Sequence, residues 1–113
     1  MTIRNLTRNT LIADKAVTAD TPLKRMTGLL NRTSFGPGEA LLITPCQSIH
    51  MLFMKFAIDV IFVDHQGKVV GACPNVRPFR LSPLFLKAHS AIEVPAGTIA
   101  SSQTQIGDNI QIN

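Results

Sequence analysis

The chain has 113 residues, of which 45% are hydrophobic and 16% are charged, and this composition favours one globular domain with one hydrophobic core. Its formal net charge of +4 comes from dispersed cations, and it has no Trp or Tyr for base stacking, so nucleic-acid binding is not expected. Two cysteines are too few for a disulfide scaffold, and the chain shows neither a signal peptide nor an apolar stretch of about 18 residues. We therefore expect a cytoplasmic protein without a membrane span.

The first part of the chain predicts short strands and one helix. Residues 2–10 and 11–17 alternate weakly between apolar and polar side chains, which is typical of short or edge strands. Residues 21–31 are expected to form the helix, because Pro22 suits its first turn and apolar residues follow at helical spacing. These apolar residues are Leu23, Met26, Leu29 and Leu30. Further on, residues 40–44 predict a short buried strand.

The strand expected at residues 56–64 is strongly apolar. Strand alternation places Phe56, Ile58, Val60 and Phe62 on one side and Ala57, Asp59, Ile61 and Val63 on the other. Both sides are apolar except at Asp59, so the strand should be central to its sheet. An ionised carboxylate buried without a partner is costly, so Asp59 should either meet a cation and backbone N–H groups or titrate with a raised pKa. The first candidates for the cation are Lys55, Arg25 and Arg32. The simplest interpretation is a structural acid that fixes strand register or holds a loop.

The next section predicts a hairpin followed by a surface loop. Residues 64–67 are a strong turn signal, and residues 68–72 should return as the partner strand. Three prolines should then break the chain into a loop that Val76 and Phe79 anchor, with brief edge pairing at 84–87. These prolines are Pro74, Pro78 and Pro83.

The last section predicts two strands separated by a helical turn at 96–103. The first strand is 90–95, and the closing strand is 110–112. Alternation in the first places Ile92 and Val94 on one side and Ala91, Glu93 and Pro95 on the other. Altogether, seven or eight short strands without strand-helix-strand alternation indicate a mainly β (α+β) domain, a small barrel or sandwich with one packed helix.

Five short segments carry a resemblance to a known family. They are Arg25 with Gly28-Leu29-Leu30-Asn31-Arg32, Phe53-Met54-Lys55, Ile58-Asp59-Val60-Ile61-Phe62, Glu93-Val94-Pro95-Ala96-Gly97, and Gly107-Asp108. In this order they resemble the motifs of the DUF192 family of small proteins of unknown function. His50-Met51 departs from a subgroup pattern in which Thr usually follows the His. The resemblance implies a single mainly β domain over residues 1–113 with a short helix at the Gly-Leu-Leu segment. It implies no reaction, and relatives in this family often carry a leader.

A cluster of polar residues in and around these segments is the candidate site. Its members are Arg25, Arg32, His50, Lys55, Asp59 and Glu93. Together they would bind an anionic or polyhydroxyl ligand through charge-assisted hydrogen bonds. Because these residues suit recognition better than covalent chemistry, the main hypothesis is a non-enzymatic ligand-binding or accessory module with a small-molecule or protein partner.

Two other functions stay open at this stage. An acid-base enzyme would need His50 and an Asp59 with a raised pKa to reach one accessible cavity. A structural or protein-protein interaction domain would instead show an exposed apolar patch and no convergent cavity. The oligomeric state is also open, with a monomer as one option.

The segment 46–54 has donor types that suit Cu(I), namely those of Cys46, His50, Met51 and Met54. In an extended segment Cys46 and His50 would lie about 13 Å apart, so we expect no metal and no other cofactor. The same two residues are the sequence-local candidates for a nucleophile and its base, but they carry no motif of a cysteine hydrolase.

Overall fold

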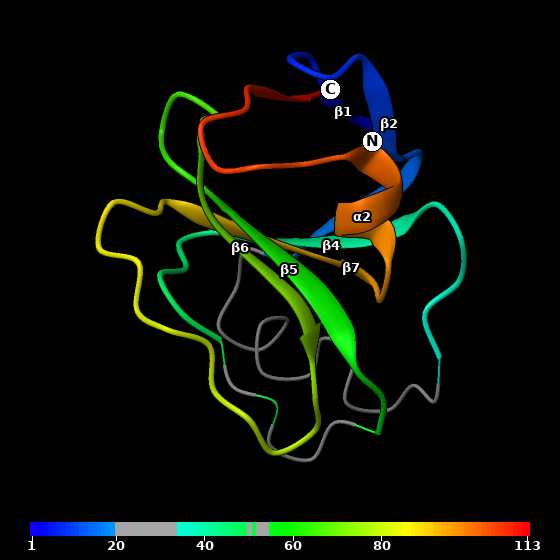
Figure 1. Cartoon of the computed structure of the whole chain (residues 1–113), viewed down its shortest axis with the longest axis vertical. Coiled ribbons are helices and arrows are strands. Elements are labelled where there is room, and N and C mark those ends of the chain that lie inside the picture. The colour runs from blue at the N-terminus through cyan, green and yellow to red at the C-terminus, as the bar shows by residue number, and fades with distance from the viewer. Residues whose placement is uncertain (20–33, 50, 52–54) are drawn as a thin grey trace.

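The computed structural model describes residues 1–19, 34–49, 51 and 55–113. These residues form two β-sheets and one short helix, α2 (Figure 1). The elements are β1 Ile3–Asn5, β2 Thr10–Ala13, β3 Lys15–Ala19, β4 Glu39–Ile43, β5 Ile58–Val63, β6 Val69–Val76, β7 Ser90–Pro95, α2 Thr98–Ser102 and β8 Ile110–Ile112. The helix predicted at 21–31 lies outside the described residues. No helix in the described part is long and apolar enough to cross a membrane.

The two sheets pack together with a hydrophobic layer between them. The three-stranded sheet has the order β2-β1-β8 and lies at the top of Figure 1 with both termini, while the five-stranded sheet β3-β4-β7-β5-β6 lies below it. The layer, here called the sandwich core, consists of Ile3, Ile12, Ala13, Ala16, Ala40, Ile61, Val63, Val69, Ile92, Val94 and Ile110. The predicted mainly β fold with sandwich packing is thereby confirmed.

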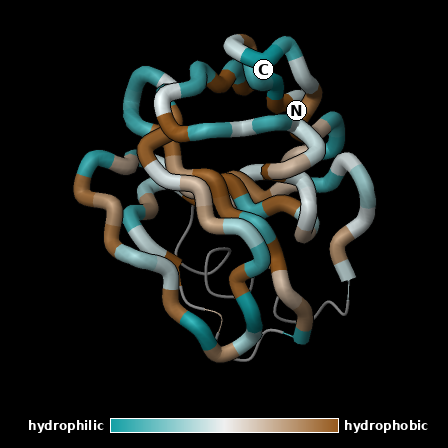
Figure 2. The backbone as a smooth tube through the Cα atoms, viewed as in Figure 1, coloured by the Kyte–Doolittle hydropathy of each residue, from teal (hydrophilic) through white to brown (hydrophobic). Residues whose placement is uncertain are grey.

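The opposite face of the five-stranded sheet carries a second hydrophobic cluster, which loops cover. This loop-covered core consists of Ala19, Leu41, Ile43, Ile49, Met51, Ile58, Val60, Phe62, Val76, Ala88 and Ala91, with Phe35, Cys46, Phe56, Val70, Cys73 and Phe85 packed against it. Figure 2 shows hydrophobic residues concentrated along the crossing strands in the middle of the molecule. One sheet thus separates two cores, each built on one side of the same strands.

Strand β5 confirms the predicted alternation. All six of its residues are buried, with Val60 in the loop-covered core and Ile61 in the sandwich core. The strand begins at Ile58 and lies between β7 and β6, so it is an interior strand as expected. The middle strand of the sheet, however, is β7, which pairs with β4 on one side and β5 on the other.

The section after the hairpin differs from the prediction in three places. Strand β6 continues through Pro74 to Val76, because it is an edge strand and a proline there removes no ladder hydrogen bond. Phe79 does not anchor the loop, since its side chain is 67% exposed. Residues 84–87 form no strand. The predicted turn at 64–67 is present, with Gly67 at a positive φ of 83°.

Candidate functional site

Three carboxyl groups are buried among the described residues, and they decide where a functional site can lie. Asp59, Glu93 and Asp108 are 1%, 8% and 3% exposed. A buried carboxylate is costly unless hydrogen bonds or opposite charges compensate it. The partners of each group therefore show which carboxyl groups have a structural role.

Asp59 is compensated by backbone N–H groups. Its Oδ1 accepts a hydrogen bond from the N–H of Asn75 at 2.8 Å, and its Oδ2 accepts from the N–H groups of Gly97 at 3.1 Å and Ile99 at 2.8 Å. Gly97 is the N-cap of α2 and has no side chain to cap the helix, so Asp59 provides that cap from another element. The structural interpretation of Asp59 therefore accounts for its carboxylate within the described residues.

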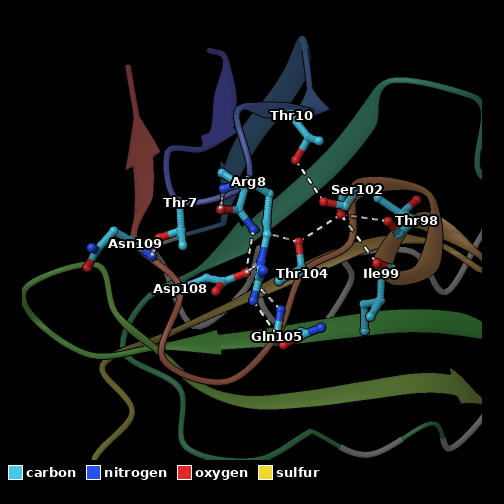
Figure 3. Close-up of polar contacts among 11 residues, drawn as sticks. Thr7, Arg8, Thr10, Thr98, Ile99, Ser102, Thr104, Gln105, Asp108 and Asn109 are labelled. Atoms are coloured by element: carbon cyan, nitrogen blue, oxygen red, sulfur yellow. Dashed lines mark hydrogen bonds and ion pairs between the residues drawn. The ribbon is translucent and has the colours of Figure 1, made fainter.

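Asp108 is compensated by the side chains of Asn5 and Arg8 and by one backbone N–H group. Its Oδ2 accepts hydrogen bonds from Asn5 Nδ2 at 2.9 Å, Arg8 Nε at 3.1 Å and the backbone N–H of Gln105 at 3.0 Å; Figure 3 shows the arrangement around it. Burial raises the pKa of Asp108, but the hydrogen bonds from Asn5 and Arg8 outweigh it, and the pKa lies below its usual value. This network joins β1 to the segment before β8.

The polar network of Asp108 extends through hydroxyl groups to α2. The hydroxyls of Ser102 and Thr104 lie 2.7 Å apart, and Thr10 donates to the carbonyl of Ser102 at 2.7 Å (Figure 3). Buried polar groups that are fully hydrogen-bonded fix the geometry of neighbouring elements. The network therefore connects α2 with the three-stranded sheet.

Glu93 differs from the other two carboxyl groups. It lies on the middle strand β7, opposite Val60 of β5 and Leu41 of β4, so its side chain points into the loop-covered core. Within the described residues, no hydrogen bond or ion pair reaches its carboxyl group. Burial raises the pKa of Glu93 from 4.5 to about 7. At neutral pH this side chain therefore exchanges between its protonated and ionised forms.

The sheet separates two of the residues that the sequence grouped together. Glu93 pairs with Val60, whereas Asp59 pairs with Val94, so the two carboxyl groups point to opposite faces. Lys55 is exposed just before β5 and has no ion pair within the described residues. The remaining members of the predicted cluster lie outside the described residues; they are Arg25, Arg32 and His50. Of the three cluster members that the structure describes, Glu93 is the buried one on the loop-covered side.

The predicted sulfur and imidazole donors do not form a described metal centre. Met51 is a buried member of the loop-covered core, and the thiol of Cys46 donates to the carbonyl of Ser48 at 3.1 Å. His50 and Met54 lie outside the described residues. Among the residues described, no group of three or more His, Cys, Asp or Glu side chains is placed to hold an ion.

The geometry defines a class of protein: a small two-sheet β domain with one buried carboxyl group on the loop-covered face of its middle strand. The chain belongs to the DUF192 family, whose model, described as "Uncharacterized ACR", matches residues 4–112. A UPF0127 protein of Thermococcus sibiricus is 34% identical over 113 residues, which cover 94% of this chain and 71% of that protein. A UPF0127 protein of Pyrococcus furiosus is 31% identical over 115 residues and 96% of both chains.

Two solved structures share the fold. A protein of unknown function from Novosphingobium aromaticivorans matches with a TM-score of 0.82 and 20% identity, covering 98% of this chain and 82% of the other. A proposed transcription regulator of Sinorhizobium meliloti matches with a TM-score of 0.79 and 19% identity, covering 97% and 89%. At these identities the likeness shows the common fold alone.

The structure also explains how the recognised motifs relate to one another. Asp59 of the Ile-Asp-Val motif binds the backbone of Gly97 in the Glu-Val-Pro-Ala-Gly motif, and Asp108 of the Gly-Asp motif binds Asn5 and Arg8. Sequence reasoning missed these partners, since two of the three N–H donors to Asp59 belong to apolar or glycine residues. With Asp59 and Asp108 accounted for, Glu93 is the motif carboxyl group whose role the described contacts do not explain.

Proposed function

We propose that the protein is a small non-enzymatic ligand-binding module in which Glu93 binds a cationic or hydrogen-bond-donating group of the ligand. One observation carries this proposal: a carboxyl group, 8% exposed, points from the middle strand into an apolar cluster without a partner among the described residues.

The energetics of burial support a binding role for Glu93. A leucine at this position would pack against Leu41 and Val60 without the cost of desolvating a carboxyl group. In surroundings of low polarity, a charge-assisted hydrogen bond to a carboxylate is stronger than the same bond in water. The matching ligand would therefore carry an ammonium, amidinium or amide N–H group attached to an apolar body that contacts the loop-covered core.

The raised pKa of Glu93 predicts how binding depends on pH. A cation binds the ionised carboxylate, so proton and ligand compete for the same group. With a pKa of about 7, Glu93 is mostly protonated at pH 6 and mostly ionised at pH 8. Cationic ligands should bind more tightly at pH 8 than at pH 6, and a neutral amide N–H donor should show the same dependence more weakly.

A thermal-shift screen of the full chain at pH 6 and pH 8 tests the proposal. The probes are n-butylamine, benzamidine, agmatine, benzamide and butyrate, and a probe at 100 times its Kd should stabilise the fold by about 2.7 kcal/mol. The expected result is a pH-dependent shift with at least one cationic probe that Glu93→Gln abolishes. Glu39→Gln is the matched control, because Glu39 is the other glutamate of the chain and lies half-buried at the start of β4. A probe that shifts the wild type and Glu93→Gln equally would place binding elsewhere.

A second candidate function is supported by the same pKa. A carboxyl group that titrates near neutrality suits general acid-base catalysis. The sequence hypothesis gave this role to Asp59 with His50, but both carboxylate oxygens of Asp59 already accept backbone hydrogen bonds. An enzyme would therefore use Glu93. A pH-rate profile with a transition near pH 7 would favour this candidate over a binding module, provided that Glu93→Gln removes the transition.

A further inference from the structure

The loop between β6 and β7 exposes an unusual set of apolar side chains. Phe79, Leu81, Leu84 and Leu86 are 67%, 74%, 61% and 74% exposed. Three exposed cations lie among them in the same segment, Arg77, Arg80 and Lys87. Residues 77–87 are here called the apolar-basic loop. Figure 2 shows hydrophobic and hydrophilic residues alternating along this loop at the left of the view.

Hydrogen bonds hold the apolar-basic loop in a defined shape. The backbone N–H groups of Phe79, Ser82 and Phe85 donate to the carbonyls of Met51, Ile49 and Gln47 at 2.8, 2.9 and 2.8 Å, respectively. The side-chain amide of Gln47 also donates to the carbonyl of Leu86 at 2.8 Å. The exposed side chains thus project from a loop that is tied to the segment beside it.

The local geometry directs one aromatic ring inward and another outward. Phe85 packs against Phe62 with ring centroids 4.6 Å apart, and this contact attaches the loop to the loop-covered core. Phe79 has a φ of 66°, a conformation that is unfavourable for a bulky residue. Its N–H bond to Met51 keeps it there, so the exposure of Phe79 is imposed by the fold.

The charge distribution of the chain is asymmetric around this loop. From His65 to Ile92 the sequence contains four cations and no Asp or Glu, whereas the rest of the chain contains seven cations and seven acids. These 28 residues therefore account for the whole formal net charge of +4 (four minus zero there, seven minus seven elsewhere). The apolar-basic loop itself holds three of these cations and no Asp or Glu, which favours an anionic partner.

We propose that the apolar-basic loop binds the surface of an anionic phospholipid bilayer. Apolar side chains that project between cations can enter the boundary between headgroups and acyl chains, while the cations contact lipid phosphates. These four apolar side chains are 61–74% exposed and project separately, and fluid lipids can rearrange around each of them. A second copy of the chain is a poorer partner, because it would bring the same cations together. The proposal rests on the exposed side chains of the loop and does not depend on a ligand at Glu93.

Sedimentation of the full chain with lipid vesicles tests the inference. Vesicles of phosphatidylcholine are compared with vesicles that also contain about 30% phosphatidylglycerol, at low and at high salt. We expect at least a tenfold stronger partition to the anionic vesicles, weakened by salt. The paired variant Leu81→Ser with Leu86→Ser should reduce the partition at least tenfold, and so should Arg80→Gln with Lys87→Gln.

Matched controls use other exposed apolar residues elsewhere on the molecule. Leu6→Ser with Ile106→Ser removes side chains that are 54% and 68% exposed, and should leave the partition unchanged. Urea unfolding of each variant confirms that its fold persists. Equal partition of the wild type to neutral and anionic vesicles, or none to either, would overturn the proposal. So would loop-dependent binding of poly-glutamate without vesicle binding, which would indicate an acidic protein partner, or loop-dependent self-association in sedimentation velocity.

Discussion

Replacing Glu93 by glutamine should change how the stability of the protein depends on pH. The pKa of Glu93 is about 7 in the folded protein against 4.5 ordinarily, and a difference of this size corresponds to about 3 kcal/mol. Because folded Glu93 keeps its proton to a higher pH than in the unfolded chain, its contribution to stability is largest below pH 4.5 and falls as the pH rises to about 7. Glutamine does not titrate, so the variant loses this dependence.

Urea unfolding at intervals between pH 5 and pH 8 measures the effect. The free energy of unfolding of the wild type, minus that of Glu93→Gln, should fall by about 2 to 3 kcal/mol across this range. The three histidines of the chain contribute equally to both proteins and cancel in the difference. A difference between wild type and Glu93→Gln that stays constant from pH 5 to pH 8 would refute the burial of this carboxyl group without a partner among the described residues.

Two further substitutions test the structural contacts. Asp59→Asn should lower the free energy of unfolding by about 2 to 5 kcal/mol, because its amide NH₂ would face a backbone donor. Asp64→Asn should lower it less, since one oxygen of Asp64 accepts both backbone hydrogen bonds and the amide oxygen of asparagine can replace it. If urea unfolding shows the same loss of stability for Asp59→Asn and Asp64→Asn, the proposed role of the Asp59 hydrogen bonds is wrong. Gly71→Ala should cost about 1 to 3 kcal/mol, because the new Cβ would lie 2.5 Å from the ring of Phe85. Gly36→Ala is its control, because the new Cβ there meets the flexible side chain of Glu39. If both substitutions lower the thermal midpoint equally, the ring of Phe85 moves aside without cost and the prediction is wrong.

Much of the sheet could be predicted because side-chain alternation records burial directly. Ile92 and Val94 face the sandwich core, and Ala91 lies in the loop-covered core, as the period of two indicated. The closing strand and the hairpin turn were also readable from local residue types. Phe79 was predicted wrongly, because large aromatic residues usually anchor a loop and its positive φ leaves no trace in the sequence.

The candidate site was only partly predictable, because its members depend on strand register. Alternation alone assigns Asp59 and Glu93 each to one side of its own strand. Whether the two sides coincide depends on the pairing of Val60 with Glu93, and a shift by one residue would have brought the carboxyl groups to one face. The backbone donors to Asp59 lie 16, 38 and 40 positions along the chain, a distance at which no local pattern predicts contact.

The separation of two cores by one sheet affects where such a domain can accept substitutions and insertions during evolution. The sandwich core is enclosed by strands on both sides, and the hydrogen bonds of Asp59 and Asp108 are made by the elements around it. The face with Glu93 is instead closed by loops. Loops accept insertions and substitutions more readily than paired strands do. One half of the molecule thus preserves the fold, while the other is free to acquire new binding partners.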